Sequence, residues 1–283
     1  MQLAVRSGRL TLSVFLACAA LTASCVSDKG QGKLTAVPEL RPGLVVGYLS
    51  QTTLPNSLAL LPSPPAAGSV AFALDEEYSQ KSLGLRDTPA WTLAASDADL
   101  MFPHAASTFS CALNAPITEG DTPHLYMLLR RTLTDAGLST YAAKDHYRRT
   151  RPFILNKLPM CTPEDAAMLE KDGSYPSGHN AIGMAWALIL SEISPEQTDA
   201  ILARGRAFGL NRILCNVHWH SDTLQGRAMG AYTVARLHAD PAFRADLEAA
   251  RTELEAVRAR GLRATRDCSA EAAAVALQQS LMQ

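Results

Sequence analysis

The sequence predicts a mainly α-helical protein with long loops, and three observations support this prediction. Apolar residues recur at helical spacing through most of the chain after residue 70, proline stands in the first turn of several of these stretches, and no run of alternating β-branched residues predicts a strand. The 283 residues, 47% of them hydrophobic, can fill the core of one large domain or two small ones. The net charge of −1 offers no electrostatic reason to bind nucleic acid or an anionic membrane surface.

Residues 1–25 have the layout of a secretory signal peptide. Two arginines precede an apolar segment that ends near Leu21, and this segment is too short to span a membrane. The stretch Leu21–Cys25 also resembles a bacterial lipoprotein processing site, in which Cys25 would carry a lipid anchor, although Thr22 replaces the usual aliphatic residue. Either form of cleavage predicts an exported, periplasmic protein.

Export determines how the remaining cysteines are interpreted. Four of them belong to the part of the chain that would fold: Cys111, Cys161, Cys215 and Cys268. In an oxidising compartment they can form two disulfides with three alternative connectivities, and the sequence does not choose among these. Their scattered spacing is not that of a zinc site.

The chain after the signal divides into three parts. Residues 26–70 are rich in Pro, Gly, Ser and Thr and are predicted to form an extended arm, residues 71–260 a helical domain, and residues 261–283 a C-terminal tail. Helices are predicted, in chain order, at Leu74–Leu83, Pro89–Leu100, Thr122–Tyr147, Pro163–Glu170, Pro176–Ile193, Pro195–Leu210, Val217–Leu237 and Pro241–Arg260. In the longest of them, Gly137 can bend or break the helix. No later apolar run approaches the length of a spanning helix.

The stretch Tyr175–His179 marks the start of the most apolar helix. Pro176 disfavours the α region at Tyr175, Ser177 is a good N-cap, and helix-forming residues follow. The free backbone N–H groups and the macrodipole of such a helix start suit an anion, which Gly178 lets approach closely, and His179 beside it can donate a proton. Taken alone, the same residues are typical of an ordinary capped helix.

Two further clusters carry charge. Lys144 and Arg151 are seven residues apart, so they would point the same way if one helix continued through both, with Pro152 ending the element. Alone, this pattern is typical of a solvated basic helix end. In the third cluster, His218 and Asp222 would be neighbours on one helical face.

This third cluster contains the residue types of a histidine nucleophile and of an acid that orients its ring. The carboxylate of Asp222 can hold one ring nitrogen of His218 and leave the other as a nucleophile or base. Arg212, just before that predicted helix, offers donors suited to phosphate oxygens. A surface His–Asp pair is the ordinary interpretation of this cluster alone.

Together the three clusters resemble the three-part signature of the type 2 phosphatidic acid phosphatase superfamily. That signature reads Lys144, six residues, Arg151-Pro152; then Pro176-Ser177-Gly178-His179; then Arg212, five residues, His218, three residues, Asp222. The flanking text, including Cys161-Thr162-Pro163-Glu164-Asp165, is similar more narrowly to the bacterial class A non-specific acid phosphatases. The resemblance covers roughly Ala71 to Arg236.

The resemblance implies a single-domain helical bundle that hydrolyses phosphate monoesters with broad specificity. His218 would form a phosphohistidine, Asp222 would orient its ring, and His179 would protonate the leaving group and then activate water. The phosphate would be held by five groups: Lys144, Arg151, Ser177, Gly178 and Arg212. No metal or other cofactor is required, and phosphate or vanadate would occupy the anion site. A pH optimum on the acid side is expected, because His179 must be protonated for the first step.

One departure from the family pattern is Asn211, which stands where the family usually has serine. Because asparagine can still donate and accept hydrogen bonds, we expect altered rate or selectivity without loss of activity. The physiological ester is not predicted by the sequence. A homo-oligomer and a lipid anchor at Cys25 are both compatible with it.

Three alternatives share these residues. A vanadium haloperoxidase would hold vanadate in the same pocket. A metal hydrolase would use His179, His218, His220 and Asp222 as ligands, although His-x-His on a helix points its two rings to different sides. A helical binding protein would hold phosphate without turnover, and Asn211 is the residue that supports this alternative.

Overall fold

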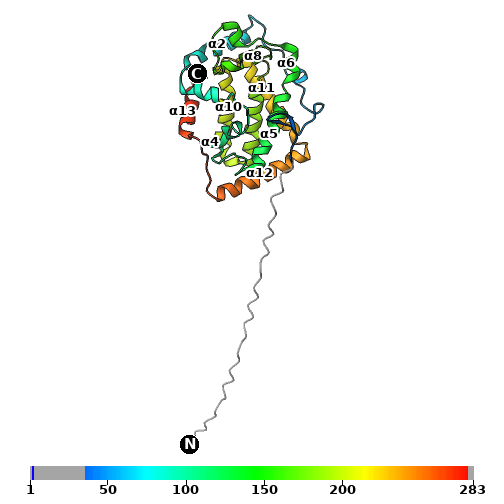
Figure 1. The fold of residues 1–283 in the computed structure, drawn as a ribbon, viewed down its shortest axis with the longest axis vertical. Coiled ribbons are helices and arrows are strands. Elements are labelled where there is room, and N and C mark those ends of the chain that lie inside the picture. Colours follow the sequence, from blue (N-terminus) through cyan, green and yellow to red (C-terminus); the bar gives the residue numbers. More distant parts are fainter. Residues whose placement is uncertain (1, 3–35, 280–283) are drawn as a thin grey trace. The chain divides into compact units, whose positions relative to one another are not determined.

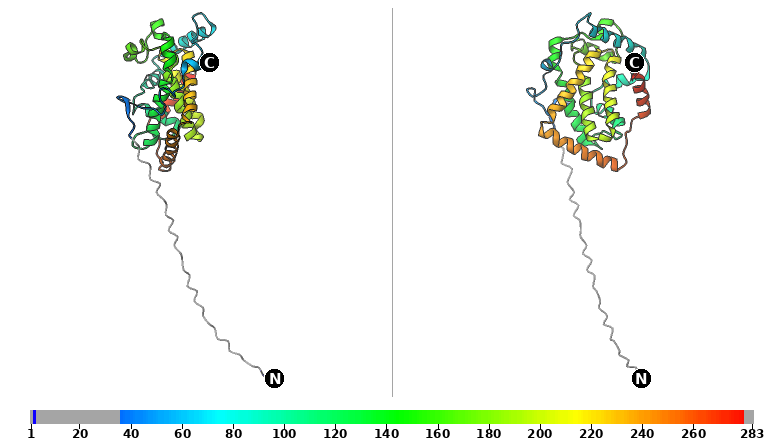
Figure 2. Two further views of the ribbon diagram at one scale, coloured as in Figure 1. Left: turned by 90° about the vertical axis from the view of Figure 1, so that its right-hand side faces the viewer. Right: turned by 180° about the vertical axis from the view of Figure 1, so that it is seen from behind.

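The computed structural model of the chain describes residues 36–279, together with residue 2. The predicted signal segment and the proposed lipidation site at Cys25 lie outside the described residues. The described part is mainly helical, which confirms the predicted fold class (Figure 1). Its centre is formed by three long helices that run side by side: α9 (Gly178–Ile193), α10 (Thr198–Leu214) and α11 (His220–Leu237) (Figures 1 and 2).

Helix α9 is buried along most of its length, and of its residues only Glu192 is exposed. Trp186 in its middle is fully buried, and its indole N–H donates to the Leu129 carbonyl of α5 (Pro123–Leu138) at 3.1 Å. A large apolar side chain buried in this way stabilises the fold by roughly 1.5–3 kcal/mol. On the other side, any side chain at Gly226 of α11 would collide with the Ser177 carbonyl. The small residue therefore lets the starts of α9 and α11 approach closely.

The remaining elements, apart from the C-terminal helix described below, surround this centre. They are the antiparallel strands β1 (Glu39–Arg41) and β2 (Leu44–Val45), the α-helices α1 (Ser57–Leu60), α2 (Val70–Ser82), α3 (Pro89–Ser96), α4 (Ser110–Leu113), α6 (Tyr141–Tyr147), α7 (Pro152–Asn156), α8 (Ala166–Leu169) and α12 (Pro241–Ala259), and the 3₁₀ turns η1 (Leu83–Leu85), η2 (Ala105–Phe109), η3 (Pro163–Asp165) and η4 (Pro195–Gln197). Within residues 36–279, no helix is both long and apolar enough to cross a membrane.

The predicted long helix Thr122–Tyr147 is two helices in the structure. The break between α5 and α6 comes just after Gly137, where Ser139 Oγ donates to the Ala136 carbonyl at 2.8 Å and Thr140 Oγ1 to the Gly137 carbonyl at 2.7 Å. Such local side-chain hydrogen bonds compete with continuation of the helix. After the break, Tyr141 and Lys144 of α6 line the same cavity as Gly178 and His179 at the start of α9.

Two other predicted boundaries that bear on the site are wrong. Pro152 was expected to end a basic helix, but it is the first residue of α7, where its missing N–H costs nothing. The helix expected from Val217 begins only at His220, so His218 precedes α11 and does not share a helical face with Asp222. Both differences place catalytic candidates at element ends, where side chains can converge on one point.

The C-terminal segment contains a helix that the sequence analysis did not predict. Helix α13 (Cys268–Gln279) packs against α3 and α10, and Cys268 at its start is bonded to Cys111. The second disulfide joins Cys161 to Cys215. These pairings settle the connectivity that the spacing left open.

Candidate active site

The three sequence clusters meet at one cavity of about 250 Å³. The walls come from α5, α6, α8, the start of α9, the end of α10 and the segment before α11. Six of the eight predicted site residues line it: Lys144, Arg151, Gly178, His179, Arg212 and His218. The other two, Ser177 and Asp222, are buried behind this wall.

Lys144 and Arg151 converge although no single helix connects them. Lys144 Nζ lies 3.3 Å from Asp172 Oδ2 and donates to the Gly173 carbonyl at 2.6 Å. Arg151 Nη2 donates to the same Asp172 oxygen at 3.0 Å. Burial, followed by the charge of Arg151, lowers the pKa of Lys144 to about 8. Asp172 therefore holds both cations toward the cavity and neutralises only part of their charge.

Gly173 is where the chain passes closest to this pair of cations. A Cβ at this position would lie 2.8 Å from the Lys144 carbonyl and 3.1 Å from Arg148 Cα. Because both of these are backbone atoms, a larger residue would push the Asp172–Gly173 segment away from α6. The glycine thus fixes the distance at which its carbonyl meets the Lys144 ammonium.

Arg212 has the least satisfied side chain in the site. It is only 2% exposed, and its Nε and Nη1 atoms have no hydrogen-bond partner among the described residues. Burial and then the charge of Arg151 lower its pKa, although a guanidinium remains cationic at physiological pH. Buried polar groups are normally hydrogen-bonded, so these donors indicate a place for an anionic ligand.

His218 is held in one protonation pattern. Its Nδ1 lies 3.3 Å from Asp222 Oδ2, and its Nε2 lies 3.2 Å from Arg151 Nη1. Because arginine only donates, this contact favours the tautomer in which Nε2 is unprotonated and Nδ1 carries the proton toward Asp222. Burial, followed by the charges of Arg151 and Lys144, lowers the pKa of His218 well below its usual range. A neutral imidazole with a lone pair on Nε2 therefore faces the cavity.

His179 stands on the cavity wall at the start of α9. Its Nε2 lies 3.0 Å from the Ala98 carbonyl, which can only accept, so Nε2 carries a proton and Nδ1 is the atom left for a ligand. Burial and then the charge of Arg212 lower the pKa of His179 well below its usual range. A bound phosphate dianion would act in the opposite direction and favour the protonated ring.

Ser177 and Gly178 have different places at the same helix start. The Ser177 side chain caps α9 and accepts from Asn180 Nδ2 at 3.0 Å, while its N–H donates to the Asp222 carbonyl at 3.0 Å. This last bond joins the second and third clusters directly. Gly178 lines the cavity with its backbone exposed to a ligand.

Arg149 and Asp75 are site residues that sequence reasoning missed. Arg149 donates from Nη1 to Asp222 Oδ1 and from Nη2 to Asp75 Oδ2, both at 2.6 Å. Asp75 also accepts from the backbone N–H and the hydroxyl of Ser221, at 2.6 and 2.7 Å. Asp222 in turn accepts from the Trp219 N–H at 2.8 Å. The carboxylate beside His218 is thus fixed by buried partners on both oxygens.

Asn211 does not face the cavity. It is fully buried, its Nδ2 donates to Asp97 Oδ2 at 2.7 Å, and its Oδ1 accepts from Gln278 Nε2 of α13. The departure from the family pattern therefore lies in the contact between α10 and the C-terminal helix. Its expected effect on rate or selectivity remains a prediction.

The ligands proposed for a metal hydrolase do not gather at one point. His220 turns away from His218 and stacks on Tyr78, with ring centroids 3.9 Å apart. Across residues 36–279, no group of three or more His, Cys, Asp or Glu side chains is placed to hold a metal ion. The side chains that line the anion cavity are instead mainly cationic or apolar.

Comparison with known proteins agrees with this geometry. Residues 124–245 match the family model of the PAP2 superfamily. The chain is 42% identical over 244 residues to a protein from Providencia stuartii named "Non-specific acid phosphatase", covering 86% of this chain and 96% of that one. It is 42% identical over 200 residues to a protein of the same name from Salmonella typhimurium, covering 70% of this chain and 80% of that one.

Two further proteins are similar to this chain. A protein from Zymomonas mobilis named "Acid phosphatase" is 40% identical over 203 residues, with 72% of this chain and 77% of that one covered. A solved structure described as the first bacterial vanadium-dependent iodoperoxidase matches with a TM-score of 0.46 and 13% identity, covering 72% of this chain and 62% of that one.

The match to the family model and the identity with these relatives show that the chain belongs to the PAP2 superfamily. Within this superfamily, the chain belongs to the class A non-specific acid phosphatases, which are phosphoric monoester hydrolases. The resemblance drawn from the three sequence clusters is thereby confirmed.

We predict that Arg149→Met lowers both activity and stability. The substitution leaves the buried carboxylates of Asp75 and Asp222 without their shared cation, a change that typically costs about 3–5 kcal/mol of unfolding free energy. It should also lower kcat, because Asp222 would no longer hold the His218 ring. The measurements are urea unfolding and steady-state kinetics on p-nitrophenyl phosphate.

Arg148→Met is the matched control for this experiment. Arg148 is the adjacent arginine, it is exposed, and no ion pair involves it among the described residues. The Arg148→Met substitution should leave the free energy of unfolding and kcat close to those of the unsubstituted protein. Equal effects of the two substitutions would contradict the role assigned to Arg149.

Proposed function

We propose that this acid phosphatase works through a phosphohistidine intermediate on His218 without a metal ion. The observation that carries the proposal is the geometry of His218 on the buried cationic cavity, where Nε2 lies 3.2 Å from Arg151 Nη1 and Nδ1 lies 3.3 Å from Asp222 Oδ2. A lone pair beside cations suited to a phosphate group is the arrangement that in-line attack on phosphorus needs.

The first step transfers the phosphoryl group to the enzyme. His218 Nε2 attacks phosphorus and forms the N–P bond, while the bond from phosphorus to the ester oxygen breaks. The proton of His179 goes to that departing oxygen and yields the free alcohol. Asp222 stabilises the positive charge that develops on the His218 ring, and Arg149 keeps this carboxylate in place.

The second step releases phosphate. A water molecule attacks phosphorus, its proton goes to His179, and the N–P bond breaks so that His218 Nε2 regains its lone pair. The enzyme thus returns to its starting protonation state. Because burial and nearby cations lower the pKa of His218, its nucleophilic form persists at acid pH.

The negative charge of the phosphoryl group is held by three cations and one backbone group. Arg212 would use its unpaired Nε and Nη1, Arg151 would turn Nη1 from His218 to a phosphate oxygen, and Lys144 would add its ammonium. The N–H of Gly178 completes the set at the start of α9. Ser177 acts mainly by capping α9. The same set suits vanadate, which should compete with phosphate.

Metal independence follows from the chemistry of these donors. Lys and Arg side chains bind anions and repel a metal cation, and they supply the neutralisation that a metal provides in other phosphatases. Broad specificity is supported by the rest of the cavity lining, in which the apolar side chains Leu100, Leu133 and Met168 offer no hydrogen bonds that select one alcohol.

Export to the periplasm is part of the same proposal. Two disulfides that join distant segments suit an oxidising compartment. Lipidation at Cys25 and homo-oligomerisation remain predictions from the sequence.

The direct test is hydrolysis of p-nitrophenyl phosphate between pH 4 and pH 9 in the presence of EDTA. We expect maximal activity on the acid side, undiminished by the chelator. His218→Ala should lower kcat by on the order of 10⁴-fold or more, because the nucleophile is removed. His220→Ala, two residues away and stacked on Tyr78, is the control that should keep most of the activity. Loss of activity in EDTA, or residual turnover in His218→Ala equal to that of the control, would refute the proposal.

Phosphate affinity should fall as pH rises through about 8. The pKa of Lys144 is lowered to about 8, so its ammonium is present below this pH and is lost above it. The second ionisation of phosphate lies at the lower end of this range and would strengthen binding as pH rises, so a decline in affinity reports on the enzyme. The measurement is the inhibition constant of phosphate between pH 7 and pH 9.5. Lys144→Met should bind phosphate more weakly at pH 7 and show no further decline, and an unchanged pH dependence in this variant would contradict the assignment.

A further inference from the structure

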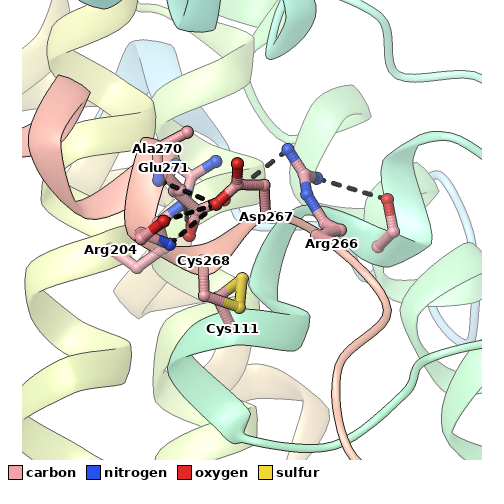
Figure 3. The surroundings of a disulfide bond; sticks show 9 residues. Cys111, Arg204, Arg266, Asp267, Cys268, Ala270 and Glu271 are labelled. Carbon is pink, nitrogen blue, oxygen red and sulfur yellow. Dashed lines mark hydrogen bonds and ion pairs between the residues drawn. A yellow bond between two sulfur atoms is a disulfide. The ribbon is translucent and has the colours of Figure 1, made fainter.

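The C-terminal helix α13 contacts the protein through buried polar side chains. Cys268 at its start is bonded to Cys111, and Glu271 one turn later forms an ion pair with Arg204 of α10, with Oε1 and Nε 3.2 Å apart (Figure 3). Near its end, Gln278 donates to Asn211 Oδ1. Glu271 and Gln278 are seven residues apart, two helical turns, so they lie on the same face. An apolar face would be sufficient to dock a helix, so these polar contacts call for another explanation.

The two partners of α13, Arg204 and Asn211, both bind one carboxylate, that of Asp97. Arg204 donates to its two oxygens at 2.8 and 2.7 Å, and Asn211 Nδ2 donates to Oδ2 at 2.7 Å. Arg204 and Asn211 are also seven residues apart, on one face of α10. Asp97, Arg204 and Asn211 are each at most 3% exposed. A buried carboxylate of this kind depends on its partners, because removing one leaves an uncompensated charge.

Asp97 is joined directly to the residue that holds His179. It caps the C-terminal end of α3, and the next residue, Ala98, offers its carbonyl to His179 Nε2 at 3.0 Å. The position of that carbonyl decides which ring nitrogen of His179 is protonated and which edge of the ring faces the cavity. The backbone at Asp97 is thus the link between the polar network and the histidine.

We propose that α13 is a positioning element for the catalytic acid: Glu271 through Arg204, and Gln278 through Asn211, fix Asp97 so that the Ala98 carbonyl holds His179 in its working orientation. This inference rests on the role proposed above for His179. It assigns Asp97, Arg204, Asn211, Glu271 and Gln278 to positioning, since none of them lines the cavity. It also gives Asn211 a function in this chain, as the hydrogen-bond acceptor of Gln278.

The test uses two substrates that differ in their need for an acid. The p-nitrophenolate leaving group is a weak base and departs without a proton, whereas the alkoxide from ethyl phosphate must be protonated as it leaves. The ratio of kcat/KM for the two esters therefore reports on the acid alone. A merely structural loss would lower both values together.

Two single variants of α13 test the two arms of the network. Glu271→Gln and Gln278→Ala should each lower kcat/KM for ethyl phosphate by on the order of tenfold, a part of the 10²- to 10⁴-fold that general acid catalysis supplies. Their kcat/KM for p-nitrophenyl phosphate should change by less than about twofold. Gln279→Ala is the matched control, since it is the same residue type in the same helix but exposed, and it should change neither value.

His179→Ala completes the experiment as the reference. It should lose far more activity on ethyl phosphate than on p-nitrophenyl phosphate, and adding Glu271→Gln to it should cause no further change in the ratio, because both act through one group. If His179→Ala discriminates between the esters and the folded α13 variants do not, the positioning role is wrong and the proposed mechanism stands. If His179→Ala itself loses both activities equally, its assignment as the acid is wrong and this inference fails with it. Should Glu271→Gln not fold, the Gln278→Ala ratio decides.

Discussion

The structure depends on burying positive charge around a cavity that must remain accessible to an anion. Lys144, Arg151 and Arg212 are each less than 5% exposed, and burial is the first cause of the lowered pKa of each. Burying unpaired charges is costly, and much of the surrounding polar structure serves to limit that cost. Asp172 partly compensates Lys144 and Arg151. The donors of Arg212 remain unsatisfied, and a phosphate dianion would supply what they lack.

The helical scaffold accommodates these charges because the charged side chains lie at the ends of helices. Arg151 precedes α7, His179 lies in the first turn of α9, Arg212 near the end of α10, and His218 just before α11. The bond from the Ser177 N–H to the Asp222 carbonyl, together with the close approach allowed by Gly226, fixes the starts of α9 and α11 to each other. Side chains at element ends can converge on one point while the helix bodies bury the apolar core.

Sequence reasoning identified the residues that line the cavity but not those that hold these side chains in place. Lys144, Arg151, His179, Arg212 and His218 were recognisable because their types and spacings carry the chemistry. Asp75, Arg149 and Ala98 were not, since their roles arise from contacts with residues 74, 73 and 81 positions away. From the sequence, Arg148 and Arg149 are equivalent, and only the fold buries one of them. Helix α13 was missed because its short stretch follows a polar segment and is anchored by a disulfide whose partner is 157 residues away.

The central claim is that the phosphoryl group of the substrate is transferred to His218 before water releases it as phosphate. This claim can be tested by trapping the phosphohistidine intermediate. The enzyme would be mixed with a rapidly hydrolysed aryl phosphate, quenched in alkali, where phosphohistidine survives, and digested for mass spectrometry. The proposed mechanism predicts one phosphoryl group on the peptide that contains His218, located on its Nε2, and none in His218→Ala. A phosphoryl group on another residue, or turnover with no labelled peptide at any quench time, would contradict it.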